Sequence, residues 1–154
     1  MTNDQQPFPS LSIYLNFEEN CMEAFEAYRA IFGGEFLNMM TFADMPPSDD
    51  MPPMPDGWDN KIMHVGLPIG DSILMGSDTP PGFGPPLVVG SNYSVSYSAP
   101  TREEVDRVFA ALSEGGEVTM ELQDMFWGDY FGSCTDRFGI NWQVHYAAEG
   151  AEGG

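Results

Sequence analysis

Lysine and arginine are scarce in this sequence: there are five of them against 24 aspartates and glutamates, and the formal net charge is −19. A field of this sign repels nucleic-acid phosphates and anionic lipid headgroups, so we expect neither kind of partner. Long apolar runs are also missing, since no stretch approaches the roughly 18 apolar residues of a membrane span. With 42% hydrophobic and 13% aromatic residues, the chain can still bury the core of one domain or of two small modules.

Cysteine is rare, and no targeting signal is visible. The first ten residues, MTNDQQPFPS, contain neither a basic cluster nor an apolar run, which predicts that no secretory signal or transit peptide is present. Cys21 and Cys134 lie far apart in the sequence and form no CxxC pair. We therefore expect reduced thiols and a cytoplasmic protein.

Motifs of nucleotide binding and of nucleophilic catalysis are missing as well. The glycines at positions 82 and 84 lie between prolines, without the spacing or the following helix of a phosphate-binding loop. Neither Gly-x-Ser-x-Gly nor a cysteine placed beside a histidine occurs. These absences argue against a nucleotide-type cofactor and against a hydrolase nucleophile.

Two amphipathic helices with defined ends are predicted. The first begins after Asn20, an N-cap residue with a glutamate three positions later, and ends at Gly33. The second begins after Thr101, again with a glutamate three positions later, and ends at residues 115–116. Cys21 lies on the apolar stripe of the first helix, which favours buried packing over nucleophilic chemistry.

The segments around the two helices follow the same order. Alternating apolar and polar residues predict a strand before each helix, at 11–17 and 93–98, and another after it, at 36–42 and 118–122. Each half then ends with two more strands, predicted at 61–69 and 72–76 in the first half and at 131–135 and 141–147 in the second. Because Gly-Gly-Glu follows both helices, the order strand, helix, strand, strand, strand indicates an internal repeat.

Proline-rich segments mark the boundaries of the two halves. We expect a disordered N-terminal arm at 1–10, a first βαβββ module at 11–78, a Pro/Gly linker at 79–91, a second βαβββ module at 92–147 and a disordered tail at 148–154. A four-stranded sheet with one helix is covered on one face only. The other face must meet the second half, another subunit or a ligand, and we expect function there.

Several short segments, taken in order, carry a resemblance to a known family. They are YLNF at 14–17, NC at 20–21, FGG at 32–34, MH at 63–64, GDSILM at 70–75, FWG at 126–128, TDRFG at 135–139 and Trp142. The sequence resembles the PhnB-like subgroup of the vicinal-oxygen-chelate superfamily, which includes glyoxalase I, bleomycin-resistance proteins and extradiol dioxygenases. The resemblance implies an α+β fold in which two βαβββ modules have mixed sheets that curl into a shared cup, often in a homodimer. A methyltransferase activity, a label attached to some PhnB-like proteins, is not expected, because no nucleotide-type glycine turn is visible.

The resemblance also bears on metal binding. Enzymes of the superfamily bind a divalent metal through His and Glu at four cup-facing strand positions, which here fall on Ser12, residues 73–75, Asn92 or Tyr93, and Gln143. None of these is a histidine or a carboxylate, and neutral oxygens bind such ions poorly. We therefore expect no metal and no other cofactor. The alternative is a divalent metal held by a rearranged ligand set around His64.

Strand alternation directs three polar side chains into the predicted cup, namely His64, Gln143 and His145. His64 is the candidate catalytic residue, as a general acid–base or as a hydrogen-bond donor to a substrate. Either histidine could instead only fix the packing of its strand. A metal held by the two histidines with Gln143 is a further alternative.

Aromatic side chains are the other candidates for a binding site. Trp127 and Tyr130 lie in a glycine-punctuated segment at 126–132, and Trp58 lies in the proline-rich loop before His64. Tryptophan and tyrosine offer flat apolar area with one hydrogen-bonding end, which suits the roof of an apolar pocket. Packing beneath a loop, or in a dimer contact, is the alternative.

Together these patterns favour a homodimeric PhnB-like protein that binds an unidentified small organic molecule in an apolar cup without a metal. Besides His64, the expected ligand-binding residues are Tyr14, Asn16, Met75, Trp127, Tyr130, Gln143 and His145. The competing hypothesis is a metal-dependent, glyoxalase- or dioxygenase-like lyase, isomerase or oxidoreductase. A dimerisation module without a ligand is a third possibility, and the sequence does not decide whether the protein is an enzyme.

Overall fold

The computed structural model describes residues 10–46, 50 and 53–147. The first module consists of β1 (Ile13–Phe17), α1 (Cys21–Phe32), β2 (Leu37–Thr41), the short 3-10 helix η1 (Phe42–Asp44), β3 (Ile62–Ile69) and β4 (Ser72–Asp78). The second consists of β5 (Val95–Ser98), α2 (Arg102–Ser113), β6 (Glu117–Asp124), β7 (Asp129–Thr135) and β8 (Asn141–Ala147). The βαβββ order and its repetition are confirmed, and each strand end lies within two residues of the predicted one. The predicted disordered arm and tail lie outside the described residues, apart from Ser10.

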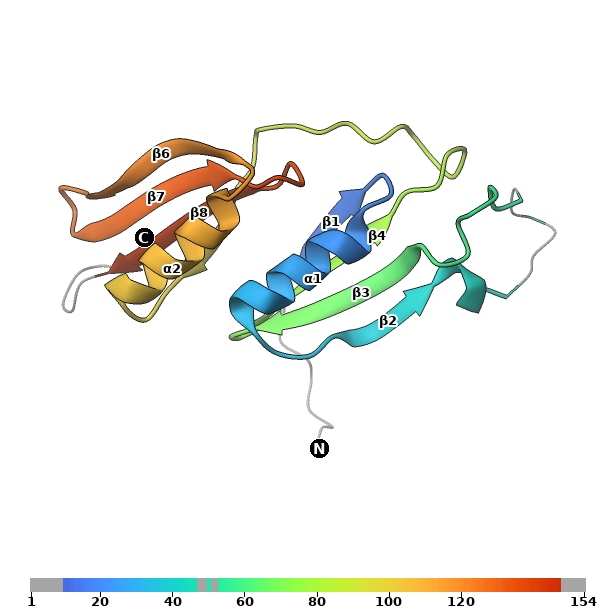
Figure 1. Cartoon of the computed structure of the whole chain (residues 1–154), viewed down its shortest axis with the longest axis horizontal. Helices are drawn as coiled ribbons and strands as arrows, with labels where there is room; N and C mark the ends of the chain where they lie inside the picture. The colour runs from blue at the N-terminus through green and yellow to red at the C-terminus, as the bar shows by residue number, and fades with distance from the viewer. Residues whose placement is uncertain (1–9, 47–49, 51–52, 148–154) are drawn as a thin grey trace.

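Each module contains one mixed four-stranded sheet (Figure 1). The strand orders are β1-β4-β3-β2 and β5-β8-β7-β6, so the two sheets have equivalent topologies. In each, the first strand pairs in parallel with the last, and the other neighbours are antiparallel. The segment that connects β4 to β5, residues 79–94, contains no helix or strand.

One face of each sheet is covered by the helix of its own module. Phe25 of α1 packs against the first sheet beside Gly76, and Val108 and Leu112 of α2 are buried against the second. In Figure 1 both helices lie in front of their sheets, which leaves the opposite faces uncovered by any helix. We call these uncovered surfaces the open faces of the two sheets.

The helix ends follow the predictions in part. Thr101 caps α2 as expected, since its hydroxyl accepts a hydrogen bond from the amide of Glu104 at 3.1 Å. Asn20 stands at the N-cap of α1, but the expected capping hydrogen bond from its side chain does not form. Instead, the carboxylate of Asp78 accepts a hydrogen bond from the Cys21 amide at 2.9 Å. A buried carboxylate at the end of β4 therefore accepts a hydrogen bond from a backbone N–H group that the first turn of α1 leaves without a partner.

The two modules share one core. Phe32 of α1 stacks on Trp142 of β8 with 5.5 Å between ring centroids, and its ring also meets Tyr97 of β5 at 4.9 Å. The hydroxyl of Tyr28 donates to the carboxylate of Asp136 in the turn between β7 and β8. These contacts fix α1 against the second module, while the sheets remain two separate sheets and do not close into one barrel.

Candidate functional site

The open face of the first sheet contains four of the predicted residues. Tyr14 on β1 stands opposite Met75 on β4, and alternation along β1 places Asn16 on the same face. His64 on β3 lies beside Tyr14, with 3.5 Å between the tyrosine hydroxyl and the imidazole Nδ1 and 5.8 Å between the ring centroids. The Tyr14 side chain is 44% exposed, so this pair faces solvent.

The open face of the second sheet carries Gln143 and His145 on β8. His145 is only 7% exposed, and its Nε2 lies 2.9 Å from the hydroxyl oxygen of Ser98 on β5. Its Nδ1 lies 3.7 Å from a carboxylate oxygen of Asp129 at the start of β7, and Asp129 is 3% exposed. Two polar side chains, from β5 and β7, thus flank the imidazole of His145 on β8.

Asp129 and Ser98 are functional candidates that the sequence reasoning missed. Asp129 follows Gly128 in a segment that we expected to be loop, but it is already the first residue of β7. The register between β7 and β8 places Asp129 beside Ala147 and Phe131 beside His145. Ser98 is one of the serines that alternate with apolar residues along β5. This alternation is the one sequence pattern that could have indicated a polar side chain on the open face at this position.

A hollow of about 270 Å³ lies next to this cluster. Its lining comes from β5, β7, β8 and the β6–β7 connection and consists of Ser96, Trp127, Asp129, Phe131, Gln143 and His145. We call it the His145 hollow. Trp127 is 45% exposed and lies edge-to-face against Phe126, with 4.9 Å between the ring centroids. The hollow therefore combines two aromatic walls with a buried carboxylate and a buried imidazole.

Tyr130 lies on the other face of the second sheet, away from this hollow. Its hydroxyl donates to Asp106 on α2 at 2.6 Å, and the guanidinium of Arg102 stacks 3.9 Å from its ring centroid. The hydrogen bond to Asp106 raises the pKa of the Tyr130 hydroxyl. Because β7 begins at Asp129, alternation turns Tyr130 towards the helix, and the expectation that it lines the same pocket as His145 is wrong.

The predicted ligand-binding residues border separate hollows. Trp127, Gln143 and His145 share the His145 hollow, whereas Tyr14 and Asn16 border another of about 250 Å³ beside residues 87–90. The reason is that the two sheets remain separate and the linker runs beside β1.

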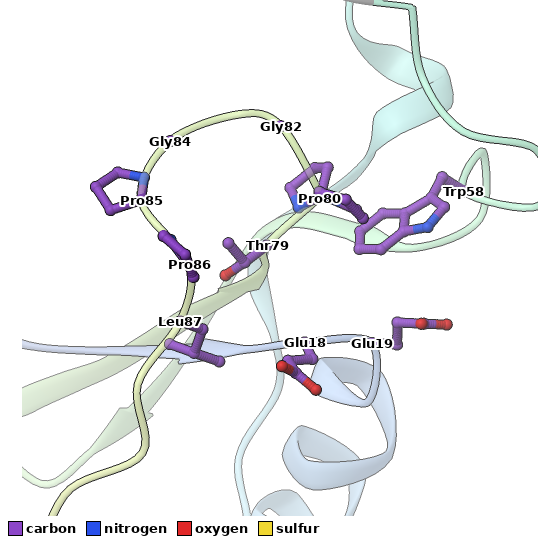
Figure 2. A pocket seen from close by; sticks show the side chains of 11 residues that line it. Glu18, Glu19, Trp58, Thr79, Pro80, Gly82, Gly84, Pro85, Pro86 and Leu87 are labelled. Carbon is purple, nitrogen blue, oxygen red and sulfur yellow. The ribbon is translucent and has the colours of Figure 1, made fainter.

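Trp58 belongs to a third hollow, which Figure 2 shows between the linker and the first module. It measures about 440 Å³ and is lined by Trp58, by Glu18 and Glu19 after β1, and by the proline-rich segment 79–87. Trp58 is 5% exposed and lies 5.7 Å from Phe42, measured between ring centroids. It therefore packs mainly as an anchor of its loop.

A further hollow of about 510 Å³ lies at the junction of the modules, between the β3–β4 turn and β5. Its walls combine apolar core side chains, among them Phe32, Leu74 and Trp142, with polar residues, namely Asp71, Ser72, Ser96 and Ser98. It lacks the buried, unpartnered polar atoms found beside His145.

The side chains available for a divalent metal are few. Where the first and last strands of each sheet pair, four residue pairs lie on the open faces: Tyr14 with Met75, Asn16 with Ser77, Ser96 with Gln143 and Ser98 with His145. Among them only His145 carries an imidazole, and none carries a carboxylate. Among residues 10–46, 50 and 53–147, no three His, Cys, Asp or Glu side chains gather into a metal-type cluster. This donor set does not fit the metal that the superfamily resemblance implies.

Comparison with known proteins places these features in context. Residues 9–145 match the sequence model of a family described as 3-demethylubiquinone-9 3-methyltransferase. Protein YjdN of Escherichia coli K12 is 33% identical over 140 residues, which cover 88% of this chain and 93% of YjdN.

Solved structures agree with that match. Protein PA1353 from Pseudomonas aeruginosa is 40% identical, with a TM-score of 0.76 over 90% of this chain and 98% of its own. A PhnB protein from Bacillus cereus shares the fold at 22% identity, with a TM-score of 0.71 over 90% of this chain and 100% of its own. Among the described helices, none is long and apolar enough to cross a membrane.

Proposed function

Because this chain belongs to the family described as 3-demethylubiquinone-9 3-methyltransferase, within the PhnB-like subgroup of the glyoxalase/bleomycin-resistance/dioxygenase superfamily, we propose that it binds a small organic molecule in the His145 hollow without a divalent metal. One observation carries the proposal. Two buried polar atoms of residues that line the hollow, Asp129 Oδ1 and His145 Nδ1, have no hydrogen-bond partner. Buried polar groups are normally satisfied, and a bound molecule would satisfy both.

The shape and lining of the hollow support a small organic ligand. Trp127 and Phe131 offer apolar area, and Gln143 and Ser96 offer neutral hydrogen-bonding groups beside it. Ligand sites usually combine apolar walls with a few placed polar groups in this way. His145 would hold one end of the ligand, oriented by its contact with Ser98.

Methyl transfer is not part of the proposal, despite the description of the family. The connection between β1 and α1 is Glu18-Glu19-Asn20, which contains two carboxylates and no glycine. A nucleotide-type cofactor needs a glycine-rich turn whose backbone can approach it closely at this kind of position. The hollow, and not the family description, therefore supports binding.

Binding can be tested with the full chain by two-dimensional NMR against a small-compound library. The expected result is a class of compounds that shifts the Trp127 indole and His145 resonances in a saturable manner. Trp127→Ala should weaken this binding, whereas the control Val88→Ala should not, because Val88 is 82% exposed and does not line the hollow. A library without any compound that binds at these residues would overturn the proposal.

The proposal that the protein binds its ligand without a divalent metal can be tested separately. Elemental analysis of protein purified without a histidine tag should find no near-stoichiometric zinc, nickel, manganese or iron. A metal present at about one per chain, and lost in His64→Ala, would overturn this part and favour the metal-dependent enzyme.

We also propose that the protein forms a homodimer. The outer strands β2 and β6 each leave one edge unpaired in their sheets, and such edges are normally covered. Apolar side chains on these two strands are exposed, namely Leu37, Met39, Met40, Val118 and Met120. Light scattering after gel filtration should give twice the chain mass. Met120→Asp should lower that mass towards one chain, while the neighbouring control Gln123→Asp should not, and a wild-type monomer would overturn the proposal.

A further inference from the structure

The buried carboxylate of Asp129 raises the question of which charge balances it. Asp129 is 3% exposed, and its Oδ1 has no hydrogen-bond partner. A buried charge without a partner carries a large desolvation cost, so buried carboxylates are nearly always paired. The partner of Asp129 must come from within the chain or from a ligand.

No lysine or arginine of the chain supplies it. All five lie within the described residues, and each has contacts elsewhere. Arg29 lies over Phe36, Lys61 beside Glu19, Arg102 against Asp124, Arg107 against Glu104 and Arg137 over Phe138. None of them lines the His145 hollow. The other carboxylates of this acidic chain strengthen the preference for a cation, and they disfavour an anionic ligand.

His145 does not complete the pairing by itself. The 3.7 Å between its Nδ1 and the nearer Asp129 oxygen, Oδ2, exceeds hydrogen-bond length. When Nε2–H donates to the hydroxyl of Ser98, the buried Nδ1 is left with a lone pair that has no hydrogen-bond partner, in a residue that lines the hollow. A ligand group with two or more N–H donors could then bind both Nδ1 and Asp129 Oδ1. An ammonium group has these donors, and it also brings the missing positive charge.

The walls of the hollow suit the rest of such a ligand. Trp127 and Phe131 both line it, and the Phe131 ring lies 6.5 Å from that of His145, measured between centroids. The faces of tryptophan and phenylalanine attract cations, and they also pack well against an apolar substituent. Trp127 is 45% exposed, so its ring is accessible to an incoming molecule.

From these observations we infer that the His145 hollow takes an organic ammonium ion, a primary or secondary amine that carries an apolar group. Its nitrogen donates to Asp129 and His145, and its apolar group packs against Trp127 and Phe131. The inference rests on the proposed function and adds the chemical class of the ligand.

The experiment compares three probes of matched shape on the full chain: 2-phenylethylammonium, 2-phenylethanol and 3-phenylpropanoate. Titrations followed by NMR at Trp127 and His145 should show the ammonium binding at least about tenfold more tightly than the alcohol, and the carboxylate not binding. Asp129→Asn should reduce the affinity for the ammonium to that for the alcohol. The control Asp71→Asn removes the same charge from the exposed β3–β4 turn and should leave the ammonium affinity unchanged.

A second variant keeps the test decisive should Asp129→Asn fail to fold. Trp127→Leu, in the exposed β6–β7 connection, removes the aromatic face and keeps apolar bulk, so it should narrow the difference in affinity between ammonium and alcohol. Equal binding of alcohol and ammonium in the wild type would overturn the inference and leave the proposed function standing. Equal losses in Asp129→Asn and Asp71→Asn would mean attraction to surface charge only, and would also overturn it. If no library compound binds at the hollow, the proposed function itself fails.

Discussion

Tyr28 of α1 donates a hydrogen bond to Asp136 over 2.6 Å and so links the first module to the turn between β7 and β8 of the second. Asp136 is 5% exposed and also accepts from the Trp142 indole at 2.9 Å and from the amides of Phe138 and Ile140. Burial, together with the charge of Asp136, raises the pKa of the Tyr28 hydroxyl far above its usual value. The tyrosine therefore remains a donor at any physiological pH, and the two modules are joined through one satisfied carboxylate.

Tyr28→Phe should lower the free energy of unfolding by about 1.5–3 kcal/mol, because it removes a buried hydrogen bond to a charged group. Urea denaturation of both proteins measures the difference. The matched control is Tyr130→Phe, which removes an equally short hydrogen bond to an aspartate on an exposed surface and should cost less than about 1 kcal/mol. Equal costs in the two variants would contradict the structural role given to Asp136.

Gly76→Ala should destabilise the first module by about 1–3 kcal/mol. A Cβ at this position would lie 2.7 Å from Cε1 of Phe25 on α1 and 2.9 Å from the carbonyl oxygen of Leu15, on the covered face of the sheet. Gly66→Ala is the control, since its Cβ would meet its nearest neighbour at 3.4 Å on the open face. Thermal unfolding of the two variants tests which face α1 covers, and a larger loss in Gly66→Ala would show the assignment to be reversed.

The two thiols should resist modification in the native protein. Cys21 is fully buried and Cys134 is 1% exposed, and burial raises the pKa of both thiols. We expect no reaction with Ellman's reagent at about pH 8 before unfolding, and reaction of both cysteines in urea. Rapid labelling of Cys21 in the folded state would reopen the idea of a reactive cysteine at the start of α1.

The raised pKa of the Asp78 side chain predicts that the stability of the protein depends on pH. Its carboxylate accepts hydrogen bonds from the amides of Cys21 and Ile62, yet burial dominates and raises its pKa above the model-compound value of 3.8. The folded state therefore holds this proton more tightly than the unfolded state. The resulting stabilisation is present below the unfolded pKa and is lost as the pH rises through the folded pKa.

The measurement compares wild type with Asp78→Asn, which cannot titrate. The free energy of unfolding of the wild type, relative to the variant, should fall as the pH rises above the unfolded value of 3.8 and through the raised pKa of the folded state. The variant loses one acceptor at every pH, so only the change with pH is informative. An increase over the same range would mean that the two amide hydrogen bonds outweigh burial.

Much of the fold could be predicted from local patterns. The apolar stripe of α2 and the cap at Thr101 depend only on neighbours within a turn or two, and the structure has both. Strand alternation likewise identified the face that carries His64 and the face that carries His145, because side chains on a strand reverse direction at every residue.

The same rule failed where a strand end was misjudged. Because β7 begins at Asp129 and not at residue 131, Asp129 lies on the open face with Phe131, and Tyr130 faces α2. The cap of α1 was also missed, since Asp78 reaches the Cys21 amide from the far end of β4. Neither contact leaves a pattern among neighbouring residues.

The sequence by itself determined the duplicated βαβββ order, the two amphipathic helices and the direction in which most strand side chains point, because each depends on spacing within a few residues. Only the tertiary structure decided that Ser98, Asp129 and His145 meet. That meeting depends on the register of β5, β7 and β8, which is set by packing across the whole sheet, and it leaves a buried carboxylate without a partner from the chain's own lysines or arginines.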